Sequence, residues 1–475
     1  MAVYDYIIVG GGISGLFMAY KLSETGKSIL LFESTNRFGG RIYTKKEKGV
    51  QFELGGARLS SNHEKVMSLL NELNLDDQLV TLPKKINYKI PGSKVKYSSL
   101  LNELVKESKH YSKKYLESIN LLQLCIDIFG FKIASMFKHM FGYDSEFYKY
   151  NAYIALKSFK EDLLTDCDYF VMKQGLSSIT DKLVSILNEQ TNVKLKLDVS
   201  IIDIGKNYVL TDKKKTYGST IVCCVPFQSL VSFPKFKDIN EVKAVQPIPL
   251  IRIYAKYPKN KSGKVWFHDI PRTITNNYIR HIIPIDYESG LIMISYTDGE
   301  YADMWSNLSK SGNKGLIEKL HKEVEEIVGI KPPKPTFITS YYWSAGVHMW
   351  KPGYDINKIY ETILKPFPNE KIYIANEAYS KHQCWVEGSL DICYDVLELI
   401  DHSFVRTKPK QKGGIENKKL KVYTLQQILK HRNWIILDIK GKLRIYDVGK
   451  WMSDHPGGSA NLRKGIKANK YYLNK

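Results

Sequence analysis

The chain has 475 residues, of which 43% are hydrophobic and 25% charged, and its 70 Lys and Arg against 49 Asp and Glu give a formal net charge of +21. This composition excludes a disordered polyelectrolyte and a collagen-like chain, and the length predicts two to four domains at roughly 150 residues per domain. A positive charge favours anionic partners in general. The basic residues are nevertheless spread along the chain without a DNA- or RNA-binding motif, so we do not expect nucleic acid to be the main partner.

Three further features bear on location. No stretch reaches the length of apolar residues that a membrane span needs, and the most apolar segment, 121–137, carries Asp127 and Lys132 and predicts a buried helix. The N-terminus runs into a strand without the basic region of a signal peptide. The six cysteines include no Cys-x-x-Cys pair, so neither a disulfide framework nor a zinc site is predicted. We expect a soluble protein of the cytoplasm or another reducing intracellular compartment, and packaging in a particle such as a virion stays open.

The N-terminal residues predict one βαβ unit. An apolar strand at 6–9 is followed by a glycine-rich turn, an amphipathic helix at 13–25 and a second strand at 28–32. The turn from Gly10 to Gly15 has the spacing G-x-G-x-x-G between strand and helix, which is the context of a dinucleotide-binding site.

Each residue of this unit has a distinct expected part in holding a dinucleotide. Gly10 permits the tight turn, Gly12 lets backbone amides approach a pyrophosphate, and Gly15 lets the helix pack on the strand. The N-terminus of the helix, which includes Ser14, then faces the anion with unpaired N–H groups. Glu33 ends the second strand, where its carboxylate can accept hydrogen bonds from both ribose hydroxyls.

The periodicity changes several times along the rest of the chain. Residues 63–165 are predicted to be mostly helical, residues 190–300 mostly strands with two-residue alternation, and residues 336–403 mixed. Residues 404–420 lack apolar periodicity and predict a linker, after which residues 421–475 form a separate segment with aromatic residues of its own.

Two segments after the βαβ unit indicate the type of dinucleotide. Arg37-Phe38-Gly39-Gly40-Arg41 and Glu53-Leu54-Gly55-Gly56-Ala57-Arg58 resemble the R-x-G-G-R and E/D-x-G-G-A-R segments of the flavin-containing amine oxidase superfamily. This superfamily includes monoamine and polyamine oxidases, protoporphyrinogen oxidase and the carotenoid desaturases. The second glycine pair would bring backbone close to the pyrophosphate and flavin, and Arg41 offers a planar donor fork to a phosphate. The resemblance continues in the family's order to about residue 403, through the segments 375–378 and 385–389.

The resemblance implies an α/β fold, α+β overall, with a Rossmann-type FAD-binding domain of the amine oxidase type and an inserted substrate domain of sheet and helices. The FAD-binding domain is predicted to be discontinuous and to take residues 1–62, 166–235 and 366–403, and the substrate domain residues 63–165 and 236–365. No cysteine lies in the segment that carries covalent flavin in monoamine oxidases, so non-covalent FAD is expected. The residues expected to bind FAD are Gly10, Gly12, Ser14, Gly15, Glu33, Ser34, Gly40, Arg41, Gly55, Gly56, Ala57, Arg58, Val199, Glu377 and Val386.

The activity implied by the resemblance is oxidation of a C–N bond of a small-molecule amine, with hydride transfer to flavin N5 and reoxidation by O2 to give H2O2. Trp385 falls where relatives carry an aromatic residue beside the flavin, and Trp350 lies in the segment that usually supplies the other wall, together with Trp343 and His348. Two alternatives stay open: an FAD-dependent dehydrogenase or desaturase that acts on another substrate and passes electrons to a carrier, or a catalytically inactive FAD-binding protein.

One position departs from the family pattern. Arg252 falls where oxidase relatives place a lysine that is bridged by water to flavin N5. Arginine could hold that water, but it stays charged and cannot act as a base near neutral pH. Lys256, four residues later in the same predicted strand, is the alternative if the register slips. We therefore expect Arg252 in the catalytic site, with O2 reactivity or the usual substrate in question.

The C-terminal segment resembles the first half of a cytochrome b5-like haem domain. The residues that carry the resemblance run from Tyr423 through Trp434 and Trp451 to His455-Pro456-Gly457-Gly458. His455 would be one axial ligand of haem iron. The chain ends before the family's second histidine, so we expect a truncated or degenerate module in which haem b lacks its second ligand.

Overall fold

The computed structural model describes residues 3–92, 95–163, 167–404, 434–439 and 442–447. The chain divides into two compact units, residues 1–407 and 408–475. In the second unit the described residues form an antiparallel hairpin of β19 (Trp434–Ile439) and β20 (Lys442–Asp447), in which Trp434 is opposite Asp447. His455 and the predicted linker from residue 405 onward lie outside the described residues.

A mostly parallel seven-stranded sheet forms the base of the first unit. Its strands are β1 (Val3–Val9), β2 (Ile29–Phe32), β9 (Val193–Lys196), β10 (Asp203–Ile204), β11 (Tyr208–Leu210), β12 (Lys215–Cys223) and β18 (Ile372–Ile374). β1 lies at the centre with β2 and β12 parallel on either side, so that Val9 is level with both Phe32 and Cys223. β9 continues the sheet beyond β2, and the second half of β12 pairs with β18. β1 and β2 are nearly continuous apolar runs because such central parallel strands are buried on both faces.

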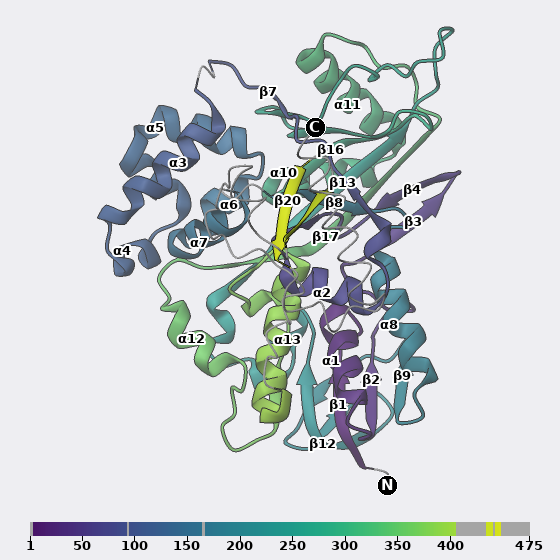
Figure 1. Cartoon of the computed structure of the whole chain (residues 1–475), viewed down its shortest axis with the longest axis vertical. Helices are drawn as coiled ribbons and strands as arrows, with labels where there is room; N and C mark the ends of the chain where they lie inside the picture. The colour runs from purple at the N-terminus through teal and green to yellow at the C-terminus, as the bar shows by residue number, and fades with distance from the viewer. Residues whose placement is uncertain (1–2, 93–94, 164–166, 405–433, 440–441, 448–475) are drawn as a thin grey trace. The chain divides into compact units, whose positions relative to one another are not determined.

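Three helices pack side by side on this sheet (Figure 1): α1 (Ile13–Ser23), α8 (Ser177–Glu189) and α13 (Val386–Ile400). α1 contacts both of the others. The seven strands and three helices all come from the segments 1–62, 166–235 and 366–403, which the sequence assigns to the FAD-binding domain.

A second sheet of six strands stands above the first in Figure 1. Its strands are β7 (Asn87–Lys89), β13 (Val245–Lys256), β14 (Thr273–Thr275), β15 (His281–Asp286), β16 (Leu291–Asp298) and β17 (Phe337–Trp350). The alternation of β13 decides which residues face the site. Ile251, Ile253 and Ala255 enter an apolar core under α10 (Gly299–Lys310) and α11 (Asn313–Val328). Arg252 and Tyr254 lie on the other face, where both side chains donate to the carbonyl of Glu53.

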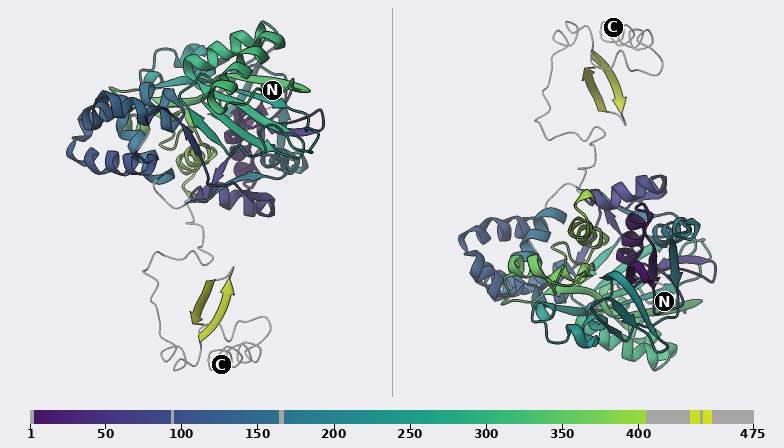
Figure 2. Two further views of the ribbon diagram at one scale, coloured as in Figure 1. Left: turned by 90° about the horizontal axis from the view of Figure 1, so that it is seen from above. Right: turned by 90° about the horizontal axis from the view of Figure 1, so that it is seen from below.

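Five helices gather in a lobe on one side of the first unit, as both Figure 1 and Figure 2 show. They are α3 (Tyr97–Glu107), α4 (Lys113–Ser118), α5 (Leu121–Phe141), α6 (Asp144–Lys149) and α7 (Ala152–Asp162). Side chains of Ser112, Asn120 and Asn151 cap the starts of α4, α5 and α7 by accepting backbone N–H groups. Phe137 centres the apolar core of the lobe, with ring contacts to Tyr97 and Phe147. Together with the second sheet, this lobe belongs to the predicted substrate domain.

Smaller elements join these parts. They are the hairpin β3 (Thr44–Glu47) and β4 (Val50–Glu53), the sheet of β5 (Leu59–Ser60), β8 (Tyr169–Met172) and β6 (Leu79–Thr81), and the helices α2 (Glu64–Glu72), α9 (Phe227–Ser232) and α12 (Ile356–Ile363).

The prediction of a buried helix at 121–137 is wrong in its burial. α5 does cover this segment, but Gly130 interrupts it with φ 74°, and Phe131 beyond the interruption is 78% exposed. The apolar composition therefore reflects two short buried faces joined by an exposed turn. No helix among the described residues combines the length and apolar character required to span a membrane.

Candidate active site

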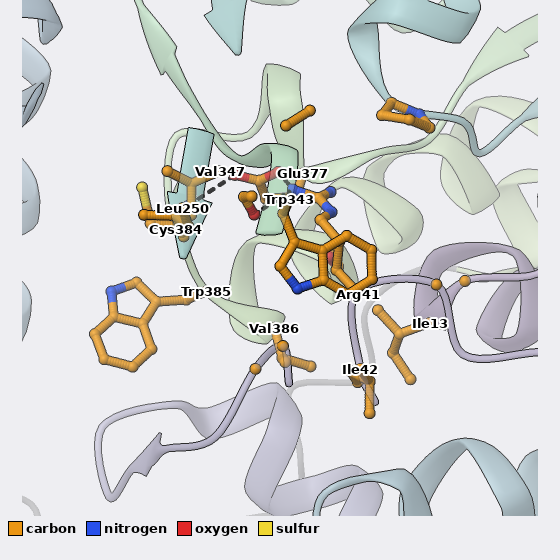
Figure 3. Close-up of a pocket in the computed structure, with 18 of the residues that line it drawn as sticks. Ile13, Arg41, Ile42, Leu250, Trp343, Val347, Glu377, Cys384, Trp385 and Val386 are labelled. Carbon is orange, nitrogen blue, oxygen red and sulfur yellow. Dashed lines mark hydrogen bonds and ion pairs between the residues drawn. The ribbon is translucent and has the colours of Figure 1, made fainter. Parts of the chain in front are cut away.

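A single cavity of about 890 Å³ connects the βαβ turn with the second sheet and the helical lobe. Its lining includes Gly10, Gly12, Ser14, Glu33, Ser34, Gly40, Arg41, Gly55, Gly56, Ala57, Arg58, Val199, Arg252, Glu377, Trp385 and Val386. Figure 3 shows one part of it, with Ile13, Arg41, Trp343, Glu377 and Trp385 around a common space. The structure thus brings together predicted site residues that are up to 376 positions apart, from Gly10 to Val386.

The glycine-rich turn is as tight as the motif requires. Gly10 has φ 105°, a conformation that residues with a side chain rarely adopt. A Cβ atom on Gly15 would lie 1.9 Å from the carbonyl oxygen of Gly10, so the start of α1 can approach the strand only with glycine there. At Gly12 a Cβ atom would meet only the Cα of Gly40, at 3.9 Å. The two glycine segments therefore leave an open cradle of backbone between them.

α1 presents its N-terminus to this cradle. Gly12, Ile13 and Ser14 line the cavity, no side chain caps the helix, and its first turn has no acidic residue. The free N–H groups and the positive end of the helix dipole form a site for an anion such as a pyrophosphate.

Glu33 is held in place at the end of β2. One carboxylate oxygen accepts from the backbone N–H of Gly11 at 2.8 Å, and the other accepts from the N–H and hydroxyl of Thr35 at 2.9 and 2.8 Å. The hydroxyl of Ser34 also contacts this second oxygen, at 3.5 Å. Oε2 accepts only from Gly11 among the described residues, so it retains an acceptor position for a ribose hydroxyl at the cavity surface.

Arg41 and the buried Glu377 form an ion pair at the cavity wall. The Nη1 of Arg41 lies 2.8 Å from Oε2 of Glu377, which also contacts Nδ1 of His348 at 3.0 Å. Burial alone would raise the pKa of Glu377, but Arg41 and His348 hold it well below its usual range. Burial lowers the pKa of His348, so the ring is neutral near pH 7. We predicted Arg41 as a phosphate ligand, and the structure shows one edge of its guanidinium already committed to Glu377.

A second helix N-terminus reaches the cavity at α13. Val386 and Ser389 of its first turn line the cavity, and Trp385 is the N-cap residue. The acidic residue of this turn, Glu387, points elsewhere: its carboxylate accepts the N–H groups of Lys65 and Val66 at the start of α2, at 3.0 and 2.9 Å. The positive end of the α13 dipole is therefore left for the cavity, where it would stabilise negative charge.

Of the predicted aromatic walls, Trp385 lines the cavity and Trp350 does not. Trp385 packs edge-on against His63, with ring centroids 4.8 Å apart, and stacks at 6.2 Å on Tyr169. Trp350 is fully buried, and its indole N–H donates to the carbonyl of Ser380 at 2.8 Å. The prediction for Trp350 is corrected: it is a core residue, and Trp343 of the same strand supplies the cavity wall.

Arg252 lines the cavity, as the alignment with the family's lysine position requires, whereas Lys256 does not. Lys256 reaches the carbonyl of Lys48 on the exposed β3–β4 hairpin instead. The guanidinium of Arg252 donates to the carbonyl of Glu53 at 3.0 Å and lies 4.7 Å from the ring centroid of Tyr296. Burial opposes its charge, but Tyr296 and Tyr254 raise the pKa of Arg252, so the side chain stays cationic.

Sequence reasoning missed the wall formed by the lobe and the second sheet. The cavity residues there include Tyr88, Tyr97, Tyr143, Glu146, Arg272, Tyr296 and Asp298. Tyr296 and Asp298 share β16, but these residues belong to no motif, so no signal in the sequence indicates them. Burial, reinforced by Asp298 and Asp162, raises the pKa of Glu146 to about 8, and burial raises the pKa of Asp298 to about 6.

Comparison with known proteins agrees with this geometry. The sequence profile of a family described as flavin containing amine oxidoreductase matches residues 13–391. The chain is 35% identical over 89 residues to amine oxidase [flavin-containing] B of Rattus norvegicus, covering 18% of this chain and 17% of the relative. It is 45% identical over 64 residues to (S)-6-hydroxynicotine oxidase of Paenarthrobacter nicotinovorans, covering 13% of this chain and 15% of the relative. The alignments thus span less than a fifth of either relative.

The fold is similar to that of a solved mutant of putrescine oxidase, with a TM-score of 0.68 at 16% identity, covering 84% of this chain and 99% of the other. The fold assignment to the FAD-dependent oxidase type is confirmed for this part of the chain. The comparisons give no support to the cytochrome b5-like interpretation of residues 421–475, and the expected haem ligand His455 lies outside the described residues.

Proposed function

Because the chain belongs to the family of flavin-containing amine oxidoreductases, we propose that it is an oxidase that binds FAD non-covalently and oxidises the C–N bond of a small-molecule amine. FAD, when bound, would accept two electrons from the substrate. O2 would then take these electrons and become H2O2. The substrate, the acceptor and a reducing intracellular location are parts of this proposal.

The observation that supports the proposal best is the continuity of the cavity. One end is lined by the glycine cradle and Glu33, and the other by tyrosines and by Trp385. A dinucleotide held at the first end by the N-terminus of α1 would place its far end among the aromatic side chains. The aromatic side chains at that end would keep water from the reacting C–N bond and favour the neutral amine over the ammonium form, which oxidation of an amine requires.

The chain's own residues would act by binding and orientation. The amides of α1 would hold the pyrophosphate, Glu33 the ribose, and the N-terminus of α13 the electron-rich edge of the flavin ring. Trp343 and Trp385 would shape the space for substrate, and Arg252 would orient a water or carbonyl near the ring without accepting a proton.

Arg252 is also the observation that favours the alternative, an FAD-dependent dehydrogenase or desaturase. A lysine can lose its proton near a flavin, but a guanidinium raised in pKa by Tyr296 and Tyr254 cannot. If that basic group is needed for rapid reaction with O2, this chain would pass its electrons to a carrier instead.

Two measurements on the purified full chain test the proposal. Absorbance bands near roughly 380 and 450 nm, present after purification or after addition of FAD, are expected from bound flavin. Anaerobic addition of amines should bleach the 450 nm band, and H2O2 should appear when O2 is admitted. Bleaching without H2O2 would favour the dehydrogenase, and a protein that stays colourless with excess FAD would contradict both. The same spectrum tests the haem prediction for His455, since haem would add an intense Soret band.

A further inference from the structure

We propose that the substrate oxidised at this site carries a carboxylate, which Arg272 and Arg58 bind where the helical lobe meets the second sheet. This inference rests on the proposed amine oxidase function and names its substrate class, an α-amino acid.

The side chain of Arg272 is the main observation. Arg272 lies just before β14 and lines the cavity. Its guanidinium makes no hydrogen bond and no ion pair with any residue that the structure describes, and its Nε is buried without a partner. A buried N–H donor of a charged group is costly to leave unpaired, so this donor is expected to meet a ligand.

Arg58 lines the same cavity and also lacks a charged partner among the described residues. Its Nη2 makes a long contact of 3.4 Å to the hydroxyl of Tyr143, and its guanidinium lies 5.9 Å from the ring centroid of Tyr169. No carboxylate among the described residues lies within ion-pair distance of Arg58. Two other arginines do have a carboxylate partner: Arg41 is paired with Glu377 at 2.8 Å, and the buried Arg280 with Asp144 at 3.1 Å.

The charges at this wall do not balance. Burial lowers the pKa of Arg272, and the positive charge of Arg58 lowers it further, so the two cations are close enough to repel each other. Two acidic residues share this wall. Asp298 already accepts the backbone N–H groups of Asp144 and Ser145. Burial raises the pKa of Glu146 to about 8, which leaves it mostly neutral near pH 7. A ligand carboxylate would supply the missing negative charge, and its geometry matches the donor fork of a guanidinium.

An α-amino acid places a carboxylate next to the C–N bond to be oxidised. The substrate would lose the hydrogen on Cα with its electron pair and one proton from nitrogen, which converts the amine to an imine. Two electrons and two protons convert O2 to H2O2, and water then splits the imine into ammonia and a 2-oxo acid. The tyrosines of the same wall, Tyr88 and Tyr97, would favour an apolar or aromatic side chain.

The experiment compares substrates that differ only in the carboxylate. L-phenylalanine is paired with 2-phenylethylamine, and L-lysine with cadaverine, and kcat/KM is measured for each by anaerobic flavin reduction in the full chain. We expect the amino acid of a pair to exceed its amine at least tenfold. In Arg272→Gln that ratio should fall roughly tenfold or more, the size expected when one charge-assisted hydrogen bond is lost.

Binding without turnover provides a second readout. Benzoate and its uncharged analogue benzamide are titrated against the holoenzyme, and the shift of the flavin spectrum is followed. Arg272→Gln should weaken benzoate binding roughly tenfold or more and leave benzamide unchanged, and Arg272→Lys should recover part of the loss. Lys264→Gln removes one positive charge from an exposed site outside the cavity and should leave benzoate binding unchanged. A thermal melt of each variant verifies folding.

Amine oxidation and carboxylate binding by Arg272 can be contradicted independently of each other. If amines are oxidised as well as their amino acids, and benzoate binds equally to wild type and Arg272→Gln, the carboxylate inference is overturned while amine oxidation stands. If neither set reduces the flavin, amine oxidation is overturned. Selective loss of benzoate binding in Arg272→Gln would then still support an anion site at this wall.

Discussion

At the scale of single residues, Gly15 carries the sharpest steric constraint of the dinucleotide turn. Its missing Cβ would lie 1.9 Å from the carbonyl oxygen of Gly10. We expect Gly15→Ala to push α1 away from β1, to destabilise the protein by about 1–3 kcal/mol and to weaken FAD binding at least tenfold. Chemical denaturation and titration of the apoprotein with FAD measure the two effects.

A matched control exists in α11. Gly315 is exposed, and a Cβ atom there would have no neighbour within 4 Å. Gly315→Ala should therefore stabilise the chain by about 0.5–1 kcal/mol and leave FAD binding unchanged. Equal losses in both variants would show that the effect at Gly15 comes from glycine removal in general and not from its contact with Gly10.

Cys384 has a backbone conformation that glycine adopts easily and other residues rarely adopt. Its φ is 72°, in the left-handed region that favours glycine. We expect Cys384→Gly to increase the free energy of unfolding by about 1 kcal/mol, because the backbone strain exceeds the added entropy of the unfolded chain. Cys384→Ala keeps the strain and removes only the thiol. A similar gain in both variants would place the effect in the thiol and not in the backbone.

At the scale of elements, His382 joins two helices through charge. It precedes α13, its Nδ1 lies 2.8 Å from Asp391 of that helix, and its Nε2 contacts Glu161 of α7. Lys65 of α2 also pairs with Asp391, at 2.5 Å. The hydrogen bonds to Asp391 and Glu161 raise the pKa of His382 from 6.5 to about 10.

This shift predicts a pH-dependent stability. A group whose pKa is raised in the folded state stabilises fully below its unfolded pKa and loses that contribution as the pH rises toward the folded value. The difference in melting temperature between wild type and His382→Gln should therefore be largest at pH 6 and shrink steadily toward pH 10. His110→Gln, at an exposed histidine, should show no such trend. A constant difference for His382→Gln would show that the contact is packing and not charge.

The helices and strands also show which parts of the structure could be predicted from sequence patterns. The βαβ unit has short, local signals, and β1, α1 and β2 lie within a few residues of the predicted ranges. Trp350 was misplaced within the segment 336–403, for which the sequence predicts a mixture of helices and strands. The alternation of β17 is broken between Trp343 and Trp350, where its pairing with β13 shifts register, and consecutive residues from Tyr342 to Val347 line the cavity. Which face is turned inward depends on the partner strand β13, and no local pattern in β17 records that pairing.

At the scale of the whole molecule, the cavity is assembled from segments that fold into two sheets and a helical lobe. The motif residues lie in or next to the glycine-rich turns that define the motifs. Their positions in the cavity could therefore be predicted from the sequence. Arg272, Tyr143 and Glu146 meet Arg58 only after three distant segments have packed together. The charge of the site is decided by this packing, so it became visible only in the structure.

The division into two units gives a final prediction. All described residues that line the cavity fall between Val9 and Ser389, inside the unit that ends at residue 407. A chain of residues 1–407 should therefore fold, show the flavin bands, and reduce its flavin with the same amines and at similar kcat/KM as the full chain. We expect its melting temperature to lie within about 2 °C of the flavin-associated transition of the full chain, because two units with separate cores unfold independently.

Absorbance spectra of the two proteins at equal concentration provide the comparison. The flavin bands should be equal, and any Soret band should occur in the full chain alone, because His455 is absent from the shorter one. A shorter chain that is colourless beside a yellow full chain would show that residues 408–475 contribute to flavin binding. That result would contradict the assignment of the complete site to the first unit.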